Sequence, residues 1–134
     1  MAKLVFITGA SSGIGQALAW RYYLAGFSLA LVARRSAEMQ TWMVQQNMSA
    51  DRCKIYSADV SDMDSIVSAG QLCLQSQGVP DVVIANAGIS VGMDSAVRSD
   101  LDVMARTFAT NNLGLAATFH PFIDAMVQRG SGAL

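Results

Sequence analysis

A glycine-rich turn near the N-terminus joins a short apolar run to a helical pattern. The apolar run covers residues 4–7, and the turn reads Thr8-Gly9-Ala10-Ser11-Ser12-Gly13-Ile14-Gly15. Glycines at such a turn let the backbone come close to a phosphate, and the first N–H groups of the following helix favour an anion at the same place. The pattern predicts a strand–turn–helix unit that binds a nucleotide.

The glycines and serines of this turn have separate expected roles. Gly9 allows the sharp turn, Gly13 lets the backbone contact a pyrophosphate, and Gly15 lets the helix pack close to the sheet. Ser11 and Ser12 add hydroxyl donors. The spacing is G-x-x-x-G-x-G rather than the commoner G-x-G-x-x-G. A glycine-rich turn without a ligand is the alternative, and the strand–turn–helix context favours the nucleotide site.

Strand and helix patterns alternate along the whole chain with short connections. Strands are expected at 4–8, 28–33, 53–58 and 82–85, and helices at 14–25, from 36, from 61 to about 78, and at about 99–128. This alternation predicts an α/β fold with a doubly wound parallel sheet, strand order 3-2-1-4 and right-handed crossovers. The ligand crevice is expected at the carboxyl ends of strands 1 and 4, where the order reverses.

Three further expectations concern details of these elements. Ser36 is placed to cap the second helix, and Pro121 to kink the last one. Residues 132–134 look like the start of a fifth strand beside residues 82–85. We therefore expect residues 1–134 to be one domain of a longer protein, truncated before or within strand 5.

Composition limits the other functions. The chain has 134 residues, 52% of them hydrophobic, and a net charge of −1, so no basic surface for nucleic acid is expected. Two cysteines and one histidine give no metal-ligand pattern. The sequence has neither a signal peptide nor a run of eighteen apolar residues. We expect no metal, no membrane partner and a cytoplasmic location.

The residues after the second expected strand indicate which nucleotide binds. An NAD site usually has an acid there, about 20 residues beyond the glycines, which holds the ribose 2′-hydroxyl. This chain has Arg34 and Arg35 instead, and guanidinium groups pair well with a 2′-phosphate. Glu38 lies further on, where the helix dipole explains it. We predict NADP(H) over NAD(H); the alternative is an ordinary solvated pair of arginines.

The opening turn resembles the cofactor motif of the short-chain dehydrogenase/reductase family. Three further segments agree with that family in order and spacing: Asp59-Val60, Asn86-Ala87-Gly88 and Asn111-Asn112-Leu113-Gly114. The resemblance implies the Rossmann fold, adenine contacts from Asp59 and Val60, and Arg34 as the 2′-phosphate ligand. It also implies that Asn86, Ala87 and Gly88 line the cofactor site, and that Asn111 belongs to the catalytic tetrad. A homo-oligomer formed through the last helix is a further implication.

The chain departs from the family's catalytic pattern. The family's hydride chemistry needs a serine and a Y-x-x-x-K pair, but Tyr22, Tyr23 and Tyr56 have no lysine four residues later. We therefore expect the cofactor-binding half of an NADP(H)-dependent oxidoreductase that acts on a small carbonyl or alcohol substrate and is inactive alone. The alternatives are a non-catalytic NADP(H)-sensing module and a purely structural domain.

Overall fold

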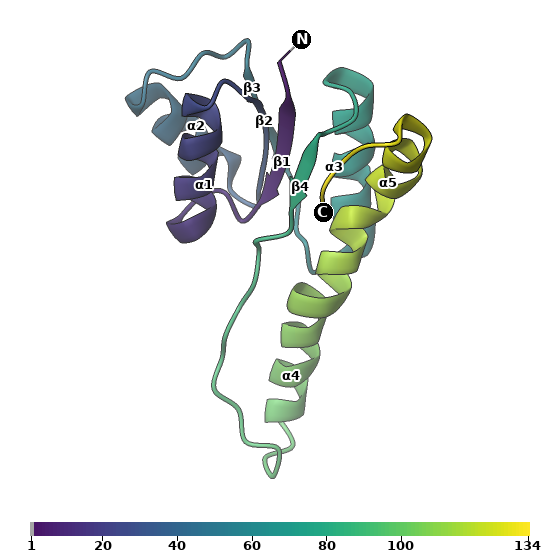
Figure 1. Ribbon diagram of the computed structural model, residues 1–134. Helices are drawn as coiled ribbons and strands as arrows, with labels where there is room; N and C mark the ends of the chain where they lie inside the picture. The colour runs from purple at the N-terminus through teal and green to yellow at the C-terminus, as the bar shows by residue number, and fades with distance from the viewer. Residues whose placement is uncertain (1) are drawn as a thin grey trace.

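A parallel four-stranded sheet forms the centre of the computed structural model, which describes residues 2–134 (Figure 1). Its strands are β1 (Leu4–Thr8), β2 (Ser28–Ala33), β3 (Cys53–Ser57) and β4 (Val82–Ile84), in the order β3-β2-β1-β4. The predicted strand order is therefore confirmed, as are the bounds of β1 and β2. Strands β3 and β4 each end one residue earlier than expected.

Helices cover both faces of the sheet. On one face lie α1 (Gly13–Leu24) and α2 (Ser36–Gln45), and on the other α3 (Met63–Ser76) and α5 (Gly114–Arg129) (Figure 1). Alternate residues of β1 point to opposite faces, so Val5 and Ile7 pack with the first pair of helices and Phe6 with the second. Both faces are buried along β1 and β2, which explains why these two strands consist almost entirely of apolar residues.

The contact between α3 and α5 depends on a small residue. A Cβ atom at Gly70 would overlap the ring of Pro121, so only glycine lets the two helices come this close. Next to it, the Phe122 ring meets Phe6 edge-on, with 4.8 Å between ring centroids. Phe6 and Phe122 are both fully buried. This packing fixes α5 against the central strand.

The starts of α2 and α3 both differ in detail from the prediction: α3 begins at Met63 rather than at residue 61, and α2 begins at Ser36 without being capped by it. The Asp62 carboxylate accepts hydrogen bonds from the N–H groups of Asp64 and Ser65, so it caps α3. The prediction that Ser36 caps α2 is wrong. Ser36 is itself the first residue of α2, Arg35 occupies the cap position, and no side chain caps the helix.

The last expected helix is helical along its length but not uniformly α-helical. It consists of α4 (Asp100–Phe108), a π-helical segment η1 (Ala109–Leu113) and α5. Single π turns inside α-helices occur often at functional sites. Figure 1 shows α4 and the loop that precedes it projecting beyond the carboxyl end of the sheet. The sequence did not predict η1.

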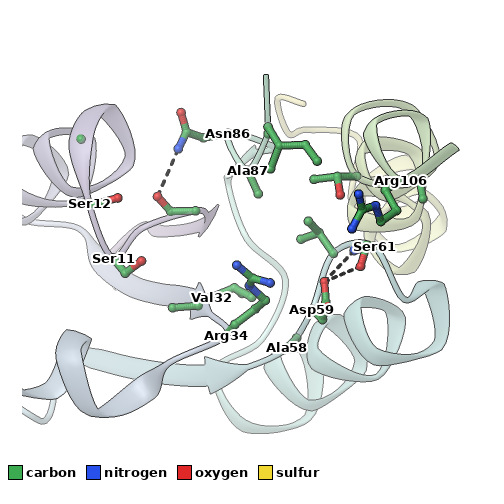
Figure 2. Close-up of a pocket in the computed structure, with 18 of the residues that line it drawn as sticks. Ser11, Ser12, Val32, Arg34, Ala58, Asp59, Ser61, Asn86, Ala87 and Arg106 are labelled. Carbon is green, nitrogen blue, oxygen red and sulfur yellow. Dashed lines mark hydrogen bonds between the residues drawn. The ribbon is translucent and has the colours of Figure 1, made fainter. Parts of the chain in front are cut away.

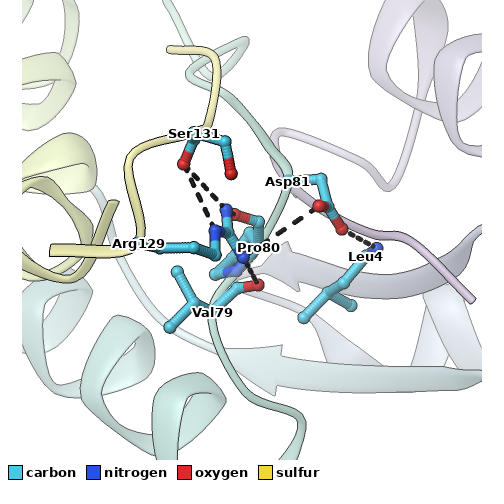
Figure 3. Close-up of polar contacts among 6 residues, drawn as sticks. All are labelled: Leu4, Val79, Pro80, Asp81, Arg129 and Ser131. Carbon is cyan, nitrogen blue, oxygen red and sulfur yellow. Dashed lines mark hydrogen bonds and ion pairs between the residues drawn. The ribbon is translucent and has the colours of Figure 1, made fainter. Parts of the chain in front are cut away.

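The end of the chain lies beside β4. Ala133 forms a parallel bridge with Val82, as expected for residues 132–134. The Arg129 guanidinium holds this region together by donating to the backbone oxygens of Val79, Pro80 and Ser131 (Figure 3).

None of the helices in residues 2–134 combines the length and the hydropathy that a membrane span requires.

Candidate functional site

A cavity of about 840 Å³ opens at the carboxyl ends of the strands. Its lining comes from the turn after β1, the ends of β2 and β3, the loop after β4, and the helix formed by α4 and η1 (Figure 2). Most of the predicted binding residues are among those that line it: Gly9, Ser11, Ser12, Gly13, Ile14, Arg34, Asp59, Val60, Asn86, Ala87 and Gly88. Gly15, Arg35 and Asn111 do not line it.

Backbone geometry explains the glycines of the turn. Gly9 and Gly13 have φ values of 64° and 54°, a conformation that favours glycine. A Cβ atom on Gly9 would lie 2.9 Å from the Cα atom of Ala87, whereas one on Gly13 would meet no protein atom within 4 Å. A Cβ on buried Gly15 would overlap the carbonyl oxygen of Gly9. Gly9 and Gly15 therefore allow the close backbone contacts of the turn, whereas Gly13 leaves the space beside it in the cavity open.

The first turn of α1 has unused hydrogen-bond donors. The N–H groups of Gly13, Ile14 and Gly15 donate to no acceptor within residues 2–134, and Ser12 at the cap position makes no side-chain cap. The same turn contains no acidic residue. Unpaired N–H groups at the positive end of a helix form an anion-binding site.

The loop after β4 is tied directly to this turn. The Asn86 side-chain amide donates to the Gly9 carbonyl oxygen at 3.2 Å (Figure 2). The Ala87 N–H donates to the hydroxyl oxygen of Thr8 at 3.1 Å. Thr8 is buried, so both contacts fix the loop relative to the end of β1.

Asp59 lies on another wall of the cavity with its charge partly stabilised. Its carboxylate accepts from the N–H and the hydroxyl of Ser61 at 3.0 and 2.7 Å (Figure 2). These hydrogen bonds hold the pKa of Asp59 below its ordinary value, and the nearby charge of Arg34 contributes less. Asp59 is therefore an ionised acceptor beside Val60.

The two neighbouring arginines lie in different environments. Arg34 lines the cavity, and Figure 2 shows its guanidinium group beside Asp59. Arg35 lies outside the lining, and its guanidinium is 3.6 Å from the Glu38 carboxylate in an exposed ion pair. The sequence predicted that both arginines bind the 2′-phosphate, but in the structure only Arg34 lines the cavity.

Asn111 lies in η1, next to the cavity lining. Its side-chain amide is bonded to the backbone of Ile89, which does line the cavity. A Cβ atom on Gly88 would lie 3.2 Å from the Asn111 Oδ1 atom, so Gly88 leaves room for this contact. The arrangement fixes the loop after β4 to the helix.

Sequence reasoning missed several lining residues, which are Val32, Ala33, Ala58, Ser61, Ile89, Val91, Val103, Arg106, Ala109 and Thr110. A signal existed for three of them. Val103, Arg106 and Thr110 are spaced by three and four residues, so they share one face of a helix that leads into the Asn-x-x-Gly motif. In residues 2–134, no group of three or more His, Cys, Asp or Glu side chains is arranged to hold a metal ion.

Comparison with known proteins places this geometry in a family. The family model for short chain dehydrogenases matches residues 3–134. A dehydrogenase/reductase SDR family protein 7-like from Anopheles gambiae is 34% identical over 137 residues, covering 98% of this chain and 43% of that protein. This chain thus spans less than half the length of that relative.

Solved structures agree with the computed fold. A short-chain dehydrogenase from Streptomyces avermitilis has a TM-score of 0.84 at 30% identity, covering 98% of this chain and 47% of that one. An alcohol dehydrogenase from Thermococcus sibiricus, complexed with 5-hydroxy-NADP, has a TM-score of 0.83 at 29% identity, covering 99% of this chain and 57% of that one. With its Rossmann-type strand order and a family match along almost its whole length, the chain belongs to the short-chain dehydrogenase/reductase family.

Proposed function

We propose that this chain is the NADP(H)-binding domain of an oxidoreductase. The observation that carries the proposal is the start of α1, where three consecutive N–H groups lack an acceptor. They lie beside Gly13, whose missing side chain leaves open space at the cavity. Such a site fits the pyrophosphate of a dinucleotide.

The adenosine end of the cofactor is assigned to the neighbouring walls. Asp59 and Val60 would bind adenine, and Arg34 the 2′-phosphate. Arg35 can join Arg34 once its exposed ion pair with Glu38 opens, because such a pair contributes little free energy. No acidic side chain follows β2 in the position that would bind a 2′-hydroxyl. The Thermococcus sibiricus relative was solved with an NADP derivative, which supports a phosphorylated cofactor.

In the proposed reaction, bound NADP(H) would exchange a hydride between its nicotinamide ring and a carbonyl or alcohol carbon of a small substrate. Asn111 would anchor a proton-relay water from η1. The family's Tyr-x-x-x-Lys pair is absent from the 134 residues, so proton transfer needs groups outside this sequence. We therefore propose that the chain binds the cofactor but does not turn over substrate by itself. A cytoplasmic location and a homo-oligomer belong to the same proposal.

Calorimetric titration with NADPH and with NADH tests the cofactor assignment. A charge-assisted hydrogen bond contributes about 1.5–3 kcal/mol, so NADPH should bind about tenfold or more tighter than NADH. Arg34→Ala should remove most of that preference, and Arg35→Ala should remove less of it. Equal affinity of the unchanged chain for both cofactors would refute the preference for NADP(H). Absence of binding would refute the proposed function.

A further inference from the structure

Arg106 is the second arginine of the cavity, and nothing so far assigns it a role. It lies on α4, whereas Arg34 follows β2, yet both line the same cavity. Figure 2 shows the two guanidinium groups at separate places around the space beside Asp59, with Arg106 on the helix side. A ligand in this cavity can therefore contact both groups.

The Arg106 guanidinium has no protein partner in the part of the chain that the structure describes. Ion pairs and side-chain hydrogen bonds there use four other guanidinium groups, those of Arg35, Arg52, Arg98 and Arg129. Neither Arg34 nor Arg106 takes part in any of them. Arg106 can therefore meet a ligand without giving up a protein contact.

The position of Arg106 favours the base over the phosphate. Arg34 follows β2, where dinucleotide-binding folds read the ribose 2′ position. Arg106 belongs to the helix that continues into η1 and α5. The start of α5 packs against Val60, which we propose binds adenine, because a Cβ atom at Gly114 would overlap the Val60 carbonyl oxygen. Arg34 follows β2 and Arg106 belongs to the helix that follows β4, so the two arginines reach the cavity from different elements.

The surroundings of Arg106 suit a flat aromatic ligand. Its neighbours in the lining on the same helix are Val103, Ala109 and Thr110, which are apolar or uncharged. The carboxylate of the cavity, Asp59, is already bonded to Ser61. A planar guanidinium in such a place stacks on aromatic faces as well as pairing with anions.

We propose that the Arg106 guanidinium stacks on the adenine ring of the bound dinucleotide from the α4 side. This proposal rests on the proposed function. It gives the two cavity arginines different tasks, with Arg34 reading the 2′-phosphate and Arg106 holding the base. Arg106 then contributes to affinity for both NADPH and NADH, and not to the choice between them.

The test is a set of NADPH and NADH titrations on the chain and three variants. Arg106→Met removes the guanidinium and keeps an unbranched side chain. Arg106→Lys keeps the positive charge but lacks the planar group that could stack. Arg98→Met is the matched control, because Arg98 is an exposed arginine outside the cavity, paired only with Asp102. Circular dichroism of each variant confirms that the fold is unchanged.

Arg106→Met should weaken NADPH and NADH binding by the same factor, about threefold to tenfold, leaving their ratio unchanged. Arg106→Lys should recover part of the loss, and Arg98→Met should lose nothing. The factor for Arg106→Met should persist when salt is raised from low to moderate concentration, because stacking is screened less than an exposed ion pair.

Two results would overturn the assignment of Arg106. Loss of NADPH affinity alone would mean that the guanidinium binds the 2′-phosphate, and unchanged affinity for both cofactors would mean that it binds neither group. A chain that binds no cofactor before any substitution would instead refute the proposed function, and would remove the ligand assigned to Arg106.

Discussion

The side-chain amide of Asn111 pairs with both polar groups of Ile89. Its Nδ2 atom donates to the Ile89 carbonyl oxygen at 2.7 Å, and its Oδ1 atom accepts from the Ile89 N–H at 2.8 Å. The two residues are 22 positions apart in the sequence, and the pair connects η1 to the loop after β4. The side-chain amide of asparagine offers a donor and an acceptor side by side, as this pairing requires.

Replacing Asn111 should loosen that loop. Asn111→Ala removes both hydrogen bonds, so the free energy of unfolding should fall by about 1–2 kcal/mol in urea denaturation. Hydrogen exchange at the Ile89 N–H should become faster. Asn112→Ala is the matched control, because Asn112 is exposed in the same segment and its side chain makes no hydrogen bond within residues 2–134. Equal losses for the two variants would contradict the pairing.

Substitutions of Gly9 and Gly13 should affect folding stability and NADPH binding to different extents. Gly9→Ala combines a strained φ with a close approach to Ala87, so it should cost about 2–4 kcal/mol of unfolding free energy. Gly13→Ala has only the strained φ, and should cost about 1 kcal/mol. Its new methyl group would nevertheless enter the cavity and weaken NADPH binding.

Thermal and urea unfolding together with NADPH titration check these two substitutions. Gly92→Ala serves as the control, because its Cβ would meet nothing and its φ is not in the left-handed range. Normal NADPH affinity in a folded Gly13→Ala variant would argue against the proposed pyrophosphate site at the start of α1.

Two buried thiols should make stability depend on pH in the alkaline range. Burial raises the pKa of Cys53 to about 11 and that of Cys73 to about 12, from the ordinary value of 9.0. Above about pH 9 the unfolded chain loses these protons while the folded chain keeps them. The stabilisation is therefore complete below pH 9 and is lost as the pH rises toward 11 and 12.

Urea unfolding at several pH values between 7.5 and 10.5 measures this effect. Each thiol lowers the free energy of unfolding by at most about 1.4 kcal/mol per pH unit within its window. Cys73→Ala should lower stability at pH 7.5, because it leaves a buried cavity, and should also flatten the alkaline decline. A decline as steep as that of the unchanged chain would show that Cys73 does not contribute to it.

Arg129 should contribute more to the free energy of unfolding than an ordinary surface arginine does. It donates to the carbonyl oxygens of Val79 and Pro80 at 2.9 and 2.6 Å, and its guanidinium also contacts Asp81 at 4.0 Å (Figure 3). Arg129→Met should lower the free energy of unfolding by about 1–3 kcal/mol, because it leaves these oxygens without their donor.

The comparison for Arg129 is Arg98→Met in the same denaturation assay. Arg98 is paired with Asp102 at 3.4 Å, but both side chains are more than three-quarters exposed. Its loss should change stability by less than about 0.5 kcal/mol. Similar values for the two variants would mean that the contacts of Arg129 are not maintained in solution.

The fold could be predicted from the sequence because its signals are local. An apolar run, a glycine turn and a helical pattern recur in order, and parallel strands joined by helices allow few arrangements. The prediction for Ser36 was wrong because the start of a helix depends on small differences in backbone angles at adjacent residues. The π-helical segment was not predicted, because its backbone hydrogen bonds produce no recognisable periodicity of residue types in the sequence.

The sequence alone determined the strand order, the glycine turn at the cavity and the presence of arginines after β2, since each follows from residues close together in the chain. Only the tertiary structure decided that Arg34 lines the cavity while Arg35 pairs with Glu38, that Asn111 meets Ile89, and that Arg106 reaches the same cavity from α4. Such contacts depend on the direction in which each side chain leaves its element and on how distant elements pack, and neither is encoded in a local pattern.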